Sequence, residues 1–157
     1  MQVHRETLEE EATHVTDEAR MVLPGVQTVL GFQLIAVFNQ RFGDQLTGAE
    51  QRLHLGATVL VALAMALIMA PAALHRQAEP RSISPRFLRV ASRLLLWGMV
   101  PLALGLCLDI YLVARVVIGG RGPAALIAVG LLAAFTVLWW VLPRSAALQR
   151  LTGGDAH

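Results

Sequence analysis

Four long stretches of this sequence carry almost no charged side chains, and they constrain the fold more than any other feature. Residues 21–40, 53–75 and 122–143 contain no Asp, Glu, Arg or Lys, and residues 94–114 contain only Asp109. A helix of about 20 residues crosses a hydrocarbon core of ~30 Å, so each stretch has the length of one membrane span. The sequence therefore predicts four transmembrane helices, which make up more than half of the chain.

The composition excludes an ordinary soluble domain. Of the 157 residues, 55% are hydrophobic and only 15% are charged, and the mean hydropathy is +0.58. So few charged residues leave too little polar sequence to cover four apolar helices in water. All 13 basic residues are arginines, and they form no cluster that could follow a nucleic acid backbone, so we expect no nucleic acid partner.

The arginines outside the spans predict the orientation. The two terminal segments and the loop between the second and third spans hold nine arginines, and the other two loops hold four. The positive-inside rule then places both termini in the cytoplasm. We expect an all-α polytopic membrane protein, an antiparallel four-transmembrane-helix bundle with an N-terminal amphipathic cytoplasmic helix. Its parts are residues 1–20, an acidic cytoplasmic helix; residues 21–144, the membrane domain, with spans at about 21–40, 53–75, 90–118 and 122–143; and residues 145–157, a short cytoplasmic tail.

The N-terminal segment and the central loop have opposite charges. Thr7 and Glu10 have the spacing of a capping box, so the amphipathic helix should run from about residue 8 to 20, with a bend at Pro24 and Gly25. One arginine and six acids give residues 1–19 a net charge of −5, whereas five arginines and one glutamate give residues 75–93 a net charge of +4. Either the acidic helix docks on the basic loop, or both are solvated faces.

Ser84 and Pro85 supply an N-cap and a first-turn proline, so the third helix should begin near Pro85 and extend beyond its span. Three arginines share one face of this extension: Arg86, Arg89 and Arg93. This face could hold the phosphates of anionic lipids or the acidic helix. Plain positive-inside anchoring is the preferred interpretation.

Small and polar residues share a narrow face of the third span. Two glycines, a proline and an acid lie on it: Gly98, Pro101, Gly105 and Asp109. Small residues let a neighbouring backbone approach closely. The second span offers a ridge of alanines four residues apart: Ala62, Ala66 and Ala70. We expect these two faces to pack together and Pro101 to kink its helix.

Asp109 is the only acid within the predicted spans, and isolating it there costs about 2.5 to 3.5 kcal/mol. It therefore requires a partner, and an intramembrane polar site is expected with candidates from the first and second spans: Gln33, Arg41, His54 and Thr58. If Arg41 pairs with it, Asp109 is a structural tie. If desolvation dominates, the carboxyl could bind and release a proton. The tie is preferred because proton relays commonly use several ionisable groups.

The sequence lacks the motifs of common enzymes. No pair of its five histidines has a spacing typical of a metal site, and neither a nucleophile elbow nor a zinc-protease helix occurs. We expect no enzymatic activity, no metal and no cofactor.

Four segments resemble a known family. They lie at residues 18–28, 38–42, 70–76 and 139–143, the last with the sequence Trp-Trp-Val-Leu-Pro. They are similar to a family of small bacterial four-span integral membrane proteins of unknown function. The likeness extends from about residue 6 to residue 144. Some members carry an automatic sodium:proton antiporter label, but the chain is too short for the usual antiporter fold of about ten or more spans. The resemblance implies the four-span topology and a place in the bacterial inner membrane, and it marks six positions of interest: Gln27, Gln33, Arg41, His75, Arg76 and Asp109.

Two kinds of function remain open at this point. The chain could act by homo-oligomerisation or as an accessory subunit of a membrane complex, as small-residue faces and short loops favour. Alternatively, it could be a proton- or cation-linked transporter or channel that uses Asp109. Binding of anionic lipids is compatible with either function.

Overall fold

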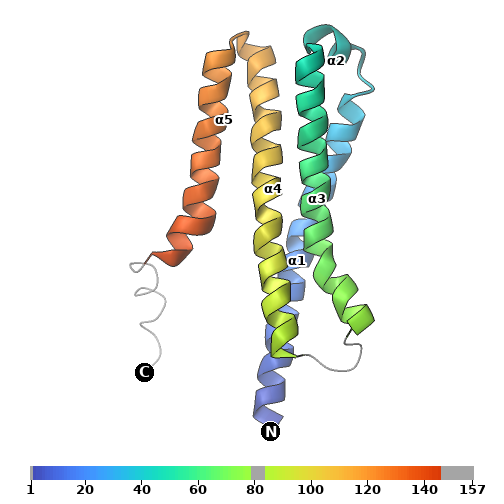
Figure 1. Ribbon diagram of the computed structural model, residues 1–157, viewed down its shortest axis with the longest axis vertical. Coiled ribbons are helices and arrows are strands. Elements are labelled where there is room, and N and C mark those ends of the chain that lie inside the picture. Colours follow the sequence, from blue (N-terminus) through green and yellow to red (C-terminus); the bar gives the residue numbers. More distant parts are fainter. Residues whose placement is uncertain (1, 79–83, 146–157) are drawn as a thin grey trace. The chain divides into compact units, whose positions relative to one another are not determined.

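The structure is a computed structural model that describes residues 2–78 and 84–145 (Figure 1). Throughout this part of the chain the regular elements are helices, so the expected all-α fold is confirmed. The α-helices are α1 (Gln2–Ala36), α2 (Gln40–Gln45), α3 (Gly48–Ala78), α4 (Pro85–Ile118) and α5 (Arg121–Thr136). A π-helical turn, η1 (Val137–Val141), and a 3-10 turn, η2 (Leu142–Arg144), follow α5.

Four helical segments are long and apolar enough to cross a membrane, as predicted: Asp17–Ala36, Gly48–Gln77, Pro85–Ile118 and Arg121–Arg144. The third helix begins at Pro85, five residues before the expected start of its span, and the first two also differ from the expected boundaries. The first ends at Ala36 rather than Gln40, and the second begins at Gly48 rather than Leu53. Thr47 accounts for the earlier start of α3, because its hydroxyl caps this helix. Asn39 caps the separate helix α2, which takes up residues expected at the end of the first span and in the loop. Helix boundaries follow these caps and not the nearest charged residue.

The first helix is longer than expected. It begins at Gln2, six residues before the expected start, so Thr7 lies inside the helix rather than at its cap. The expected bend at Pro24 and Gly25 does not interrupt it, since α1 is continuous through both residues. Proline removes only one donor from the ladder. The hydroxyl of Thr28 also bonds the carbonyl oxygen of Pro24 at 2.8 Å, which adds a local contact one turn later.

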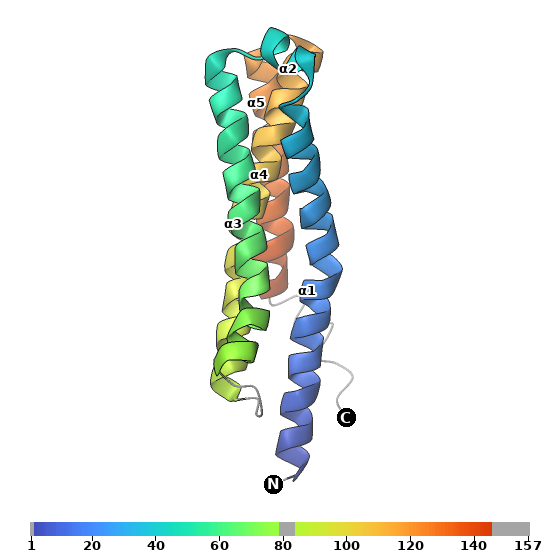
Figure 2. The ribbon, with the colours of Figure 1, turned by 90° about the vertical axis from the view of Figure 1, so that its right-hand side faces the viewer.

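The chain divides into two compact units, Met1–Leu106 and Cys107–His157. In the first unit α1 lies beside α3, and the N-terminal part of α4 also packs against α3 (Figures 1 and 2). The apolar core of this unit consists mainly of small and β-branched residues from these helices: Val26, Ala57, Val61, Ala64, Ile68, Ala91 and Ala103. Small side chains let these helices approach closely.

The two glycines of α4 lie against α3. A Cβ atom on Gly105 would lie 2.8 Å from Cγ2 of Val61 and 3.1 Å from the carbonyl oxygen of Ala57. A Cβ atom on Gly98 would lie 3.1 Å from Cγ1 of Ile68. Pro101, between the two glycines, is buried, and α4 continues through it without a break. The expected glycine face is therefore the face that packs inside the chain.

The opposing ridge on α3 differs from the one expected. Ala62 and Ala66 are exposed and Ala70 is half-buried. The glycines of α4 instead meet a line of buried residues spaced four, three and four apart, with Leu60 and Leu67 beside it: Ala57, Val61, Ala64 and Ile68. A helix has 3.6 residues per turn, so alternating steps of three and four hold a straight contact line, whereas repeated steps of four drift away from it.

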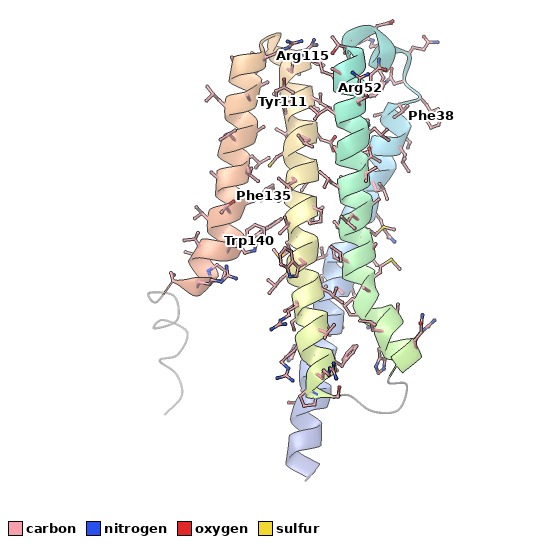
Figure 3. All side chains as sticks on the ribbon, in the orientation of Figure 1. Phe38, Arg52, Tyr111, Arg115, Phe135 and Trp140 are labelled. Carbon is pink, nitrogen blue, oxygen red and sulfur yellow. The ribbon has the colours of Figure 1, made fainter. Side chains whose placement is uncertain are left out.

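In the second unit the chain reverses at Gly119, whose φ of 76° favours glycine. Aromatic side chains gather where α5 gives way to η1: the rings of Phe135 and Trp139 stack with centroids 4.6 Å apart, and those of Trp139 and Trp140 lie 5.9 Å apart. Figure 3 shows Phe135 and Trp140 on this part of the chain. The expected tail from residue 146 onward lies outside the described residues.

Candidate functional site

Three polar side chains are buried among those that the structure describes in the first unit. Gln33, Glu50 and His54 retain only 4%, 5% and 8% of their accessible surface. They come from the end of α1 and the beginning of α3, the two helices that the short helix α2 joins. Polar groups removed from water are stable only when they are hydrogen-bonded. These three residues, with Phe42 and Thr47, form the polar cluster described below.

Glu50 closes a capping box at the start of α3. Its Oε2 accepts hydrogen bonds from the backbone N–H and the hydroxyl of Thr47, both at 2.8 Å, and the hydroxyl oxygen of Thr47 lies 3.4 Å from the backbone nitrogen of Glu50. Glu50 was missed from the sequence because residues 41–52 were expected to form the loop between two spans. The signal was present: Thr followed by Glu three residues later, ahead of an apolar run.

His54 connects α3 to the end of α1. Its Nε2 lies 3.0 Å from the backbone carbonyl oxygen of Gln33. A carbonyl oxygen can only accept, so Nε2 carries the proton of this bond. The edge of the Phe42 ring faces the imidazole, with centroids 5.2 Å apart. The prediction that Gln33 and His54 belong to one polar site is consistent with this contact, although the contact uses the backbone of Gln33.

Two other expected members of the site lie apart from this bond. The hydroxyl of Thr58 donates to the carbonyl oxygen of His54 at 2.9 Å, a bond within α3 itself. Arg41 is exposed on α2, where its backbone N–H donates to Oδ1 of the N-cap Asn39 at 3.0 Å. Figure 3 shows Phe38, in the turn before α2, pointing away from the helices, as expected of an aromatic residue at a membrane surface.

Asp109 lies on α4 in the second unit. The residue is half-buried, and its Oδ1 is inaccessible to solvent. An acid with a buried oxygen in an apolar helix is costly and is a functional hypothesis by default. Its pairing with residues of the first unit stays a prediction.

The three arginines at the start of α4 are all exposed: Arg86, Arg89 and Arg93. The predicted N-cap is confirmed, since the backbone N–H of Phe87 donates to the hydroxyl of Ser84 at 3.1 Å. The ring of Phe87 contacts that of His75, with centroids 5.5 Å apart, which holds the end of α3 against the start of α4. The expected docking of the acidic helix involves residues 79–83, which lie outside the described residues.

The chemistry available in these places is hydrogen bonding and charge. Among the residues described, no group of three or more His, Cys, Asp or Glu side chains is arranged to hold a metal ion. Cys107 is buried. The polar cluster joins helix ends, the half-buried carboxyl of Asp109 is an acid within an apolar helix, and the arginines present positive charge to the surroundings.

The comparisons with known proteins agree with the resemblance noted in the sequence. No curated protein and no solved structure matches the chain. A family model described as a family of unknown function (DUF6328) matches residues 2–143. This range includes almost all of the four apolar helices. The chain therefore belongs to DUF6328, a family of unknown function.

Proposed function

We propose that this protein is a multi-pass protein of the bacterial inner membrane that acts by associating with a second membrane-embedded chain, either another copy of itself or a larger complex. The proposal includes no enzymatic activity and no cofactor. We place both termini in the cytoplasm, because nine arginines lie in the terminal segments and the central loop and only four lie in the other two loops.

One observation supports association most directly. On α5, Gly130 and Ala134 lie four residues apart and are both exposed, and a Cβ atom added at Gly130 would meet nothing within 4 Å. In a bilayer, apolar side chains gain little by leaving the lipid, so helices associate where small residues let their backbones approach. The glycines of α4 are used in this way inside the chain, against α3. Gly130 and Ala134 on α5 are likewise small, and both are exposed.

The experiment is energy transfer between labelled copies in bilayers, measured as the protein is diluted with lipid. We expect transfer to persist on dilution for the unaltered protein and to fall for Gly130→Leu/Ala134→Leu. Ala62→Leu/Ala66→Leu is the matched control, because these alanines are also exposed and four residues apart, on α3. If the protein itself is monomeric, crosslinking in native membranes should recover a partner that the α5 variant loses. A monomer without a crosslinked partner contradicts the proposal.

Asp109 supports a second candidate function, proton- or cation-linked transport. The supporting observation is the solvent-inaccessible Oδ1 of this acid within α4. Under this candidate, sealed proteoliposomes show proton or sodium flux that Asp109→Asn abolishes, whereas Asp44→Asn, on the exposed surface of α2, leaves it unchanged. Absence of flux in the unaltered protein, across pH and an imposed potential, contradicts transport and leaves association.

A further inference from the structure

A row of exposed residues follows one face of α4 from its first turn. Arg86, Arg89 and Arg93 form the arginine stripe, and Trp97, which is 66% exposed, continues the same face. Steps of three, four and four residues at 100° per residue keep all four within a narrow arc of the helix. With a rise of 1.5 Å per residue, the stripe extends over roughly 10 Å, and Trp97 lies about 6 Å beyond it.

The charge of the arginine stripe is not neutralised by the surrounding described residues. None of the three arginines forms an ion pair with an acidic side chain that the structure describes. The first turn of α4 contains no acid, and its cap is the neutral hydroxyl of Ser84. The N-terminus of a helix already carries a partial positive charge, which disfavours arginine there. An anion from outside the chain would neutralise the positive charge of the arginines and the partial positive charge of the helix N-terminus.

Trp97 indicates where this anion would lie. Tryptophan is enriched at the level of the lipid headgroups, and the charge-free stretch of α4 begins just before it, at Leu94. The headgroup layer of each leaflet is roughly 5 to 8 Å thick. Arg93 therefore falls within this layer, and long side chains at Arg89 and Arg86 can reach back toward it. Even Arg86 lies within about one Debye length of the headgroups.

We propose that the arginine stripe and Trp97 bind the phosphate headgroups of anionic lipids. The guanidinium group presents paired donors that match phosphate oxygens. The acidic N-terminal helix is the competing ligand of the arginine stripe, but its described acids do not pair with the stripe. Asp17 lies 3.6 Å from Arg20 of its own helix, and Glu10 and Glu18 are exposed. The inference rests on the membrane placement given under the proposed function.

Trp97 also provides the measurement. The chain has three tryptophans, so Trp139→Phe/Trp140→Phe leaves Trp97 as the single indole emitter. The protein is reconstituted in phosphatidylcholine bilayers that contain a fixed mole fraction of either brominated phosphatidylglycerol or brominated phosphatidylcholine, and quenching of Trp97 is compared. We expect stronger quenching by the brominated anionic lipid. Arg86→Gln/Arg89→Gln/Arg93→Gln should remove the preference, with a loss of apparent affinity of about fivefold for each arginine.

A matched variant separates this site from general charge. Arg41→Gln/Arg52→Gln/Arg121→Gln removes three exposed arginines from other segments and should leave the preference intact. Equal quenching by the two brominated lipids, or an equal loss in both triple variants, would overturn the proposal. A preference that emerges only after Glu10→Gln/Asp17→Gln/Glu18→Gln would assign the stripe to the acidic helix instead. Failure to float with neutral vesicles refutes the membrane placement itself, whereas insertion without lipid preference refutes only this inference.

Discussion

The imidazole of His54 bonds the backbone at the end of another helix: its Nε2 lies 3.0 Å from the carbonyl oxygen of Gln33. Gln33 belongs to the last turn of α1, where carbonyl oxygens have no regular intrahelical partners. Two others of that turn, on Ile35 and Ala36, accept from the N–H groups of the following turn. His54, on α3, therefore satisfies a carbonyl oxygen at the end of α1, and this hydrogen bond holds the two helices together at this point.

His54→Ala should destabilise the protein by about 1 to 3 kcal/mol, because it removes the donor and leaves a buried carbonyl oxygen without this bond. Thermal unfolding in a neutral detergent measures the effect as a lower midpoint. His14→Ala is the control, since His14 is exposed on α1 and should change stability by less than about 0.5 kcal/mol. Equal midpoints for the two variants would show that the bond does not contribute.

The capping box at the start of α3 should behave as a coupled pair. Thr47→Ala should cost about 1 kcal/mol of unfolding free energy, because three of its polar contacts are with Glu50. In a double-mutant cycle with Glu50→Ala, the second substitution should cost less than it does alone. Thr136→Ala removes an exposed hydroxyl bonded within its own helix and should be nearly neutral. Strict additivity of the Thr47 and Glu50 effects contradicts the capping box.

The sequence predicted the four long apolar helices because burying a charge in lipid is costly, so charge-free stretches indicate helices able to span a membrane. It also predicted the Ser84 cap and the glycine face of α4, since each depends on one helix alone. It did not predict which face of α3 meets that glycine face, because the rotation of one helix against another depends on both surfaces. Glu50 was missed because it follows Arg41 and Asp44 in a segment assigned to a loop. The continuity of α1 through Pro24, whose carbonyl oxygen accepts from the Thr28 hydroxyl, was also not predicted, because a proline inside a helical pattern usually signals a bend.

Gly105→Ala should be more damaging than Gly98→Ala. The added methyl group at position 105 would meet Val61 at 2.8 Å and the Ala57 carbonyl oxygen at 3.1 Å, whereas at position 98 the nearest atom is 3.1 Å away. Overpacking of this kind costs about 1 to 3 kcal/mol, and we expect the upper part of that range for Gly105. Denaturation in detergent provides the comparison.

Val61→Ala provides a rescue test for this close contact. It should cost less in the Gly105→Ala background than in the unaltered protein, because it removes the atom that the new methyl group strikes. Gly130→Ala is the control, since the added methyl group meets nothing within 4 Å and alanine favours the helix. Equal free energies of unfolding for Gly105→Ala and Gly130→Ala would contradict the close contact between α3 and α4 at Gly105.

The orientation can be tested with single cysteines, because the chain has one native cysteine, the buried Cys107. In a Cys107→Ala background, His14→Cys, Gly122→Cys and Ser145→Cys place thiols on α1, in the first turn of α5 and after η2. Since nine arginines lie on the side of the termini and four on the other, a membrane-impermeant maleimide should label only Gly122→Cys in intact cells. The other two should react after the membrane is opened. The opposite pattern would invert the topology and place the arginine stripe in the outer leaflet, where the same lipid measurement would still apply.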